Sequence, residues 1–289
     1  MNLYDLLLAP FVEFEFMRRA LGGTALLTFS ACPVGIFLML RRMSLSGDAM
    51  AHAILPGAAV GFLMSGLGLL PMSLGGLVAG MAVALASGAV SRSTIQKEDA
   101  SLAAFYLISL ALGVLLISLK GSSIDLMQVL FGSVLALNDE ALLLIGGIAL
   151  TSIAALAVMW RALVAECFDP LFLRSVSVAG PYVHLAFLML VVLNLVGGFQ
   201  ALGTLLAVGL MVLPAAAARF WTRRLQTMCG LAVAMGLVAS LVGLLVSFHL
   251  SVASGPAIVL TAGGLYGLSL VFGRHGIFAQ RPTWRHRAA

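Results

Sequence analysis

Apolar runs long enough to cross a lipid bilayer recur along almost the whole chain, and they constrain its fold more than any other feature. A bilayer-spanning helix needs roughly 17–25 predominantly apolar residues. Of the 289 residues, 62% are hydrophobic and only 9% are charged, whereas soluble domains are roughly 45–50% apolar and about 25% charged. No polar stretch is long enough for a separate soluble domain. We therefore expect residues 1–289 to form a single transmembrane domain.

The runs predict an all-α polytopic membrane protein with about eight or nine transmembrane helices, because a helix satisfies its own backbone hydrogen bonds in lipid. Acidic residues precede the first run, which is also too long for the apolar core of a cleavable secretion signal, so we expect it to remain as a helix. The segment 121–140 is too short and interrupted for a span and predicts an outer-face or re-entrant helix. The predicted spans are 17–40, 47–66, 71–91, 100–119, 140–163, 181–197, 201–219, 227–249 and 255–273.

Positive charges gather on one side of this predicted topology. If Arg41 and Arg42 face the cytoplasm, strict alternation places there all of the 16 lysines and arginines except Arg18, Arg19 and Lys120. Cytoplasmic loops of membrane proteins carry such an excess. The pattern predicts a cytoplasmic C-terminus with a basic tail over 274–289. The net charge of +5 thus reflects topology, and no nucleic-acid partner is expected.

The three cysteines predict neither a disulfide framework nor a thiolate metal site. Cys32, Cys167 and Cys229 have no CxxC spacing and lie in or beside different apolar runs, so buried free thiols are expected.

One acidic residue stands apart from the others. Ten of the eleven acids lie in the N-terminal segment, in loops or at the margins of the apolar runs, whereas Asp48 begins a run that is otherwise almost wholly apolar. In an α-helix, residues four apart share a face, so Asp48 and His52 would lie about one turn apart. Pro56 continues the same stripe and, lacking an N–H, leaves the carbonyl of His52 without its usual helical donor.

Carboxylate, imidazole and carbonyl groups suit a divalent cation such as zinc, manganese or ferrous iron. Ionisable groups at membrane depth are costly and mark functional sites, and the small residues nearby predict that the pair faces protein or a pore rather than lipid. The structural alternative is that Asp48 caps the helix and hydrogen-bonds His52, fixing only a bend at Pro56. One chain supplies too few ligands for a four-coordinate ion, and a two-fold dimer would double the set.

Several sequence blocks resemble one known family. LRRMSLSGDAMAHAILPGAAVGF at 40–62 closely resembles the signature of the permease subunits of zinc-, manganese- and iron-uptake ATP-binding-cassette (ABC) importers. The resemblance spans nearly the whole chain, although the triplet before SGP and the residues after KED depart from the family pattern. Further matches, in order, are KEDASLAAFYLISLALGVLLIS at 97–118, LFGSVLAL at 130–137, FDPLFLRSVSVAG at 168–180, LGTLLAVGLMVLPAAAARF at 202–220 and SGPAIVLTAGGLYGLSLVFG at 254–273.

The resemblance implies a type II ABC importer permease fold in a bacterial plasma (inner) membrane. It implies a permease homodimer, two cytoplasmic ATPase subunits that use the ATP, and an extracytoplasmic solute-binding protein that delivers the metal. Asp48 and His52 match residues that coordinate the transported ion in this family. The segment 168–180 resembles the cytoplasmic coupling element that docks on the ATPase, with an ordinary interfacial linker as the alternative. Its candidate coupling residues are Phe168, Asp169, Pro170, Arg174 and Gly180.

The residues themselves leave a choice of function. The chain has no Gly-Lys dipeptide and hence no P-loop, so we expect a transporter subunit without an ATPase site of its own, not an enzyme. The alternative is a stand-alone ion-coupled metal carrier, although such carriers usually hold several ionisable groups at midplane. An intramembrane hydrolase is disfavoured because Asp48 has no acidic partner in the apolar runs. The choice among zinc, manganese and iron stays open.

Overall fold

Helices along the chain

The computed structural model describes residues 8–66, 68–119, 134, 137–168 and 180–278. Its secondary structure in this part of the chain is helical, as the apolar runs predicted. Among the described residues, eight helical spans are long and apolar enough to cross a membrane, and a ninth apolar helix, Thr204–Arg219, is shorter. The helices are α2 (Ala9–Glu13), α3 (Glu15–Leu40), α4 (Ser44–Ala53), α5 (Leu55–Ser65), α6 (Leu69–Ser93), α7 (Glu98–Leu119), α9 (Asp139–Phe168), α11 (Gly180–Leu202), α12 (Thr204–Arg219), α13 (Leu225–Leu250) and α14 (Ser254–Phe272).

The predicted spans differ from the observed helices in three places. The run 47–66 forms two helices, α4 and α5, that are interrupted at Ile54. The run 140–163 continues to Phe168 and the run 181–197 continues to Leu202, five residues beyond each predicted end, so that α12 begins at Thr204 rather than at residue 201. Apolar character marks the part of a helix that lies in lipid, but a helix continues beyond it where its backbone bonds and packing allow.

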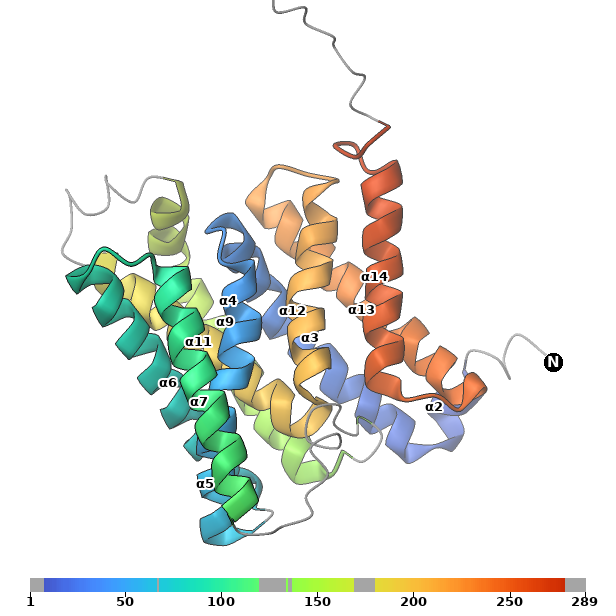
Figure 1. Cartoon of the computed structure of the whole chain (residues 1–289). Helices are drawn as coiled ribbons and strands as arrows, with labels where there is room; N and C mark the ends of the chain where they lie inside the picture. The colour runs from blue at the N-terminus through green and yellow to red at the C-terminus, as the bar shows by residue number, and fades with distance from the viewer. Residues whose placement is uncertain (1–7, 67, 120–133, 135–136, 169–179, 279–289) are drawn as a thin grey trace, which may run out of the picture.

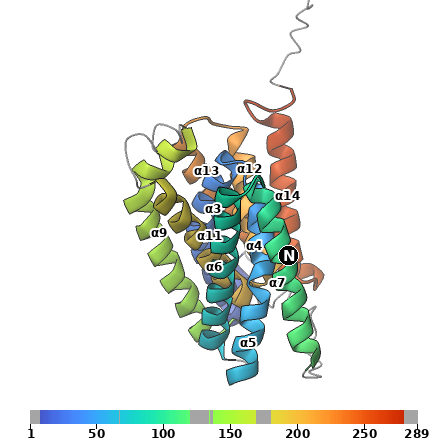
Figure 2. The ribbon, with the colours of Figure 1, turned by 60° about the vertical axis from the view of Figure 1, so that its left-hand side comes forward.

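The helices form one bundle with α3 and α11 inside it (Figures 1 and 2). Helix α3 packs against α9, α12 and α13, and α11 packs against α6, α9 and α12. Large side chains such as Phe37 and Phe187 are fully buried between them, with their rings 6.3 Å apart. Much of α9 and α14 is exposed in the single chain, as expected for helices that face lipid or another subunit.

Arginines gather at one end of the helix bundle. The α3–α4 turn, the α6–α7 and α12–α13 connections and the end of α14 lie at the upper end in Figure 1. This end, here called the basic end, carries Arg41, Arg42, Arg219, Arg223, Arg224 and Arg274. The segment 121–133 and the tail from 279 onward lie outside the described residues.

The cysteines are free thiols, as predicted. Cys32 is buried, whereas Cys167 and Cys229 are half-buried. They lie on three different helices, α3, α9 and α13.

Candidate metal site

Asp48 and His52 on one helical face

Helix α4 places Asp48 and His52 on the same face, one turn apart. The distance from His52 Nε2 to Asp48 Oδ1 is 3.9 Å, which is too long for a direct hydrogen bond but close enough for both groups to reach one ion. The Asp48 side chain is 65% exposed in the single chain and that of His52 is 29% exposed. The predicted spacing therefore brings the two groups together on a face that this chain leaves largely uncovered.

The other faces of α4 pack inside the bundle through the fully buried Met50 and several small residues. Ala49, Ala51 and Ala53 are buried, and a side chain at Gly47 would touch the end of Met211 on α12. Helix α4 thereby packs against α7, α11, α6 and α12. Asp48 and His52 lie on the face of α4 that points away from these packed residues.

Asp48 does not cap the helix. Helix α4 begins at Ser44 with Met43 at the N-cap position, so Asp48 lies one turn inside. At a rise of 1.5 Å per residue, Asp48 is about 6 Å and His52 about 12 Å from the start of the helix. The capping interpretation of Asp48 is therefore wrong.

The helix break below the pair

The break after Ala53 follows from Pro56. Proline has no N–H for the carbonyl of His52, and that carbonyl instead receives the N–H of Ile54 where α4 ends. The hydroxyl of Ser109 on α7 donates to the Ala53 carbonyl at 2.9 Å. Gly113 lets α7 approach the backbone of Pro56, since a Cβ there would lie 3.0 Å from the Pro56 nitrogen. The break is thus held by α7.

Helix α7 also supplies neighbours that the sequence did not indicate. The Tyr106 ring lies 6.4 Å from the His52 ring, centroid to centroid, and Ser46 donates to Asp99 Oδ1 at 3.4 Å. Asp99 and Tyr106 are seven residues apart and share a helical face. This spacing is the only local signal that could have identified them, but it does not reveal which helix they face.

Asp48 and His52 are too few to complete a metal site with the other described residues of this chain. No group of three or more His, Cys, Asp or Glu side chains that could hold a metal ion occurs in the described ranges. Nδ1 of His52 is buried and has no hydrogen-bond partner there. Within the described ranges Asp48 and His52 therefore offer an ion two ligands, and a four-coordinate ion would need further donors.

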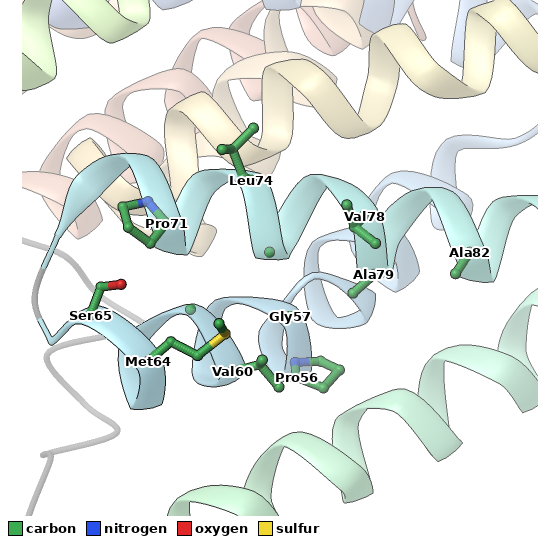
Figure 3. A pocket seen from close by; sticks show the side chains of 12 residues that line it. Pro56, Gly57, Val60, Met64, Ser65, Pro71, Leu74, Val78, Ala79 and Ala82 are labelled. Atoms are coloured by element: carbon green, nitrogen blue, oxygen red, sulfur yellow. The ribbon is translucent and has the colours of Figure 1, made fainter.

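An apolar groove continues from Pro56 along α5 and α6 (Figure 3). It encloses about 570 Å³, and its lining includes Val60 and Met64 on α5 and Leu74 and Val78 on α6. The stripe that begins with Asp48 and His52 therefore becomes wholly apolar below Pro56.

The coupling segment and a buried ionic cluster

Only the ends of the predicted coupling segment lie within the described residues. Phe168 is the last residue of α9 and is largely exposed, and Gly180 is the first residue of α11. Asp169, Pro170 and Arg174 lie outside the described residues.

A buried ionic cluster lies next to these ends and was missed in the sequence. Arg41 donates to Glu166 Oε2 at 2.5 Å and contacts His184 Nδ1 at 3.2 Å. Glu166 lies at the margin of its apolar run, as expected, but its side chain is only 14% exposed. Glu166 is 125 positions and His184 is 143 positions from Arg41 along the chain. No local sequence pattern therefore connects either residue with Arg41.

Similarity to known proteins

Sequence comparisons relate the chain to metal-transport permeases over almost its full length. The profile of the family described as "ABC 3 transport family" matches residues 13–273. The chain is 33% identical to the "Manganese import system permease protein ScaB" of Streptococcus parasanguinis over 257 residues, 89% of this chain and 90% of the relative. It is 30% identical to the "Chelated iron transport system membrane protein YfeC" of Yersinia pestis over 282 residues, 97% of this chain and 94% of the relative.

Structural comparison gives the same fold. The structure described as "PsaBC from Streptococcus pneumoniae in complex with Fab" matches with a TM-score of 0.84 and 30% identity, covering 95% of this chain and 97% of that chain. A metal-chelate type ABC transporter in an inward-facing conformation matches with a TM-score of 0.68 and 14% identity, covering 90% of this chain and 87% of that chain. The second match bears on the fold alone. The predicted all-α polytopic permease fold is confirmed.

Proposed function

Because the chain belongs to the ABC 3 transport family, as the sequence blocks predicted, we propose that it is the membrane permease subunit of an ATP-driven importer of a divalent transition metal ion. Residues 1–289 act as one permease domain. The chain contributes no nucleotide site, since it has no P-loop, and its work is to open the ion path alternately to the two sides of the membrane.

The observation that carries this proposal is the placement of Asp48 and His52. They lie one turn apart on a face of α4 that the chain leaves largely uncovered, and they offer a carboxylate and an imidazole, ordinary ligands for manganese, iron and zinc. Relatives named as manganese and iron permeases support this class of ion. Asp48 and His52 are proposed to ligate the ion in transit.

A homodimer would complete the site. Two ligands from each of two chains give four, the number that a tetrahedral zinc site requires. The incomplete donor set in one chain and the uncovered Asp48–His52 stripe support a second copy on this side of the bundle. The apolar groove between α5 and α6 continues this stripe and supplies apolar surface for the contact.

Two further partners follow from the family. The ATPase pair is proposed to dock at the basic end, with Phe168, Asp169, Pro170, Arg174 and Gly180 in the coupling segment, and a solute-binding protein is proposed to deliver the ion at the opposite end. The arginines of the basic end support a cytoplasmic orientation. With this orientation the C-terminus is proposed to be cytoplasmic, and the family supports the proposal that the membrane is a bacterial inner membrane.

Reconstitution separates this proposal from a stand-alone carrier. The chain would be placed in proteoliposomes alone or with its ATPase and binding protein, and uptake of Mn²⁺, Fe²⁺ and Zn²⁺ measured with and without ATP. Uptake is expected only with the ATPase and ATP. Metal flux through the chain alone, driven by a proton gradient, would instead establish the carrier.

A further inference from the structure

A second pocket lies at the basic end, away from Asp48 and His52. It encloses about 470 Å³ between the ends of α3, α12 and α14. Met39, Ala216, Phe220 and Tyr266 supply its less polar walls, and the rings of Phe220 and Tyr266 meet edge to face with centroids 5.7 Å apart. Three cationic or titratable side chains complete the lining, namely Arg219, Arg223 and His275.

The chain after α14 folds back to close this pocket. The backbone N–H of His275 donates to the Phe220 carbonyl at 2.8 Å. Gly273 approaches Phe220 so closely that a Cβ would lie 2.7 Å from the Phe220 Cβ. Two tertiary contacts therefore bring His275 to the arginines at and after the end of α12, so the pocket does not consist of neighbouring residues of one loop.

The cations of this pocket have no acidic counterpart among the described residues. Arg219 and Arg223 are exposed, and neither forms an ion pair with a described residue. The sequence contains no aspartate or glutamate after Asp169. Nδ1 of His275 is buried and has no hydrogen-bond partner in the described part of the chain. An anion with several oxygens would supply acceptors to all three side chains.

We propose that this pocket binds the phosphate headgroup of an anionic phospholipid. The apolar walls favour an amphipathic ligand over free phosphate, and exposed Trp221 and Phe272 beside it suit the interface between headgroups and acyl chains. Basic pockets between transmembrane helices on the cytoplasmic side are known lipid headgroup sites. This site does not depend on which ion the protein transports.

Lipid binding can be measured on the full-length chain by native mass spectrometry and by titration of phosphatidylglycerol against a phosphatidylcholine background. The test variant is Arg219→Gln/Arg223→Gln. The matched control is Arg224→Gln/Arg274→Gln, which removes the same charge from neighbouring arginines that do not line the pocket. Loss of two headgroup contacts predicts at least about tenfold weaker phosphatidylglycerol binding in the test variant and less than about twofold in the control.

Several results would overturn the proposal. Equal weakening in both double variants would mean that net charge, not the pocket, attracts the lipid. Displacement of phosphatidylglycerol by millimolar inorganic phosphate would identify a free-anion site. If the test variant lost its association with the ATPase but still bound phosphatidylglycerol, the pocket would be a protein contact and not a lipid site. Arg219→Lys/Arg223→Lys, which keeps the charge, is expected to retain most of the binding, and its failure to do so in a folded protein would also count against the site.

Discussion

Arg41, at the end of α3, donates a 2.5 Å hydrogen bond to Glu166, in the last turn of α9. The Arg41 side chain is only 6% exposed, and its guanidinium carbon lies 4.4 Å from the centre of the Phe187 ring on α11. His184 on α11 contacts the same guanidinium. One arginine next to the turn before α4 thereby ties together the two helices that flank residues 169–179.

Breaking this pair should destabilise the protein strongly. Glu166→Gln or Arg41→Met leaves a buried charge without its partner, and the expected loss is about 3–5 kcal/mol in the free energy of unfolding. Replacing both residues, as in Arg41→Met/Glu166→Met, should recover part of that loss because no unpaired charge remains. The loss is measured by thermal or denaturant unfolding of the purified protein.

The opposite end of the same two helices provides the control. Arg19 on α3 pairs with Asp139 on α9 at 3.1 Å, but both side chains are much more exposed. Asp139→Asn should change the stability by no more than about 1 kcal/mol. A Glu166→Gln effect as small as that of Asp139→Asn would show that the buried pair is not a structural tie.

Loss of either proposed metal ligand should abolish uptake without preventing folding. Asp48→Asn and His52→Gln keep side chains of similar size but weaken or remove ion coordination, and metal accumulation in chelator-limited cells should fall by at least about tenfold. Restoration of growth would be followed separately with zinc, manganese and iron. His249→Gln is the control, because His249 Nδ1 bonds to the Leu245 carbonyl of its own helix and its ring lies against the neighbouring Phe248.

Wild-type accumulation by both variants, at equal abundance in the membrane, would exclude Asp48 and His52 as ligands. A loss in His249→Gln of the same size would point instead to a general sensitivity of the protein to histidine replacement.

The α5–α6 hairpin should not tolerate a side chain at Gly57. A Cβ on Gly57 would overlap the carbonyl oxygen of Gly75, and the reverse is equally true. Gly57→Ala is therefore expected to push the helices apart and lower the melting temperature by several degrees, since overpacking costs about 1–3 kcal/mol. Gly264→Ala on α14 meets no atom within 4 Å and should be neutral. Equal melting temperatures for the two variants would contradict this packing.

The proposed dimer can be tested by cross-linking from the groove. In a background whose three native cysteines are replaced by alanine, Val60→Cys should form an inter-chain cross-link, because Val60 lies in the groove on the proposed dimer side and is 41% exposed. Val158→Cys on α9, which is 86% exposed, should not. Cross-linking yields on denaturing gels decide between them, and the reverse pattern would move the interface to α9.

The Asp48–His52 pair shows which features of the site a local sequence pattern can predict. Four-residue spacing and an apolar context predicted the shared face, because both are effects within one turn or two. The following proline indicated that the His52 carbonyl would lack its usual helical donor, but the run 47–66 was still expected to form one helix, so the break at Ile54 was not predicted. The same pattern could not show that Asp48 lies one turn inside α4, since the helix start depends on how the α3–α4 turn packs. It also could not place Tyr106 and Asp99, which reach the site through the pairing of α4 with α7.

The sequence by itself determined that this is a polytopic helical membrane protein, where most of its helices run, and which two ionisable side chains share a helical face. These properties follow from hydrophobicity and helical periodicity, which act over neighbouring residues. Only the tertiary structure decided that Arg41, Glu166 and His184 form one buried cluster, and that Arg219, Arg223 and His275 line one pocket. Such groupings join side chains from helices distant in sequence, and they depend on how the helices pack, which no local spacing encodes.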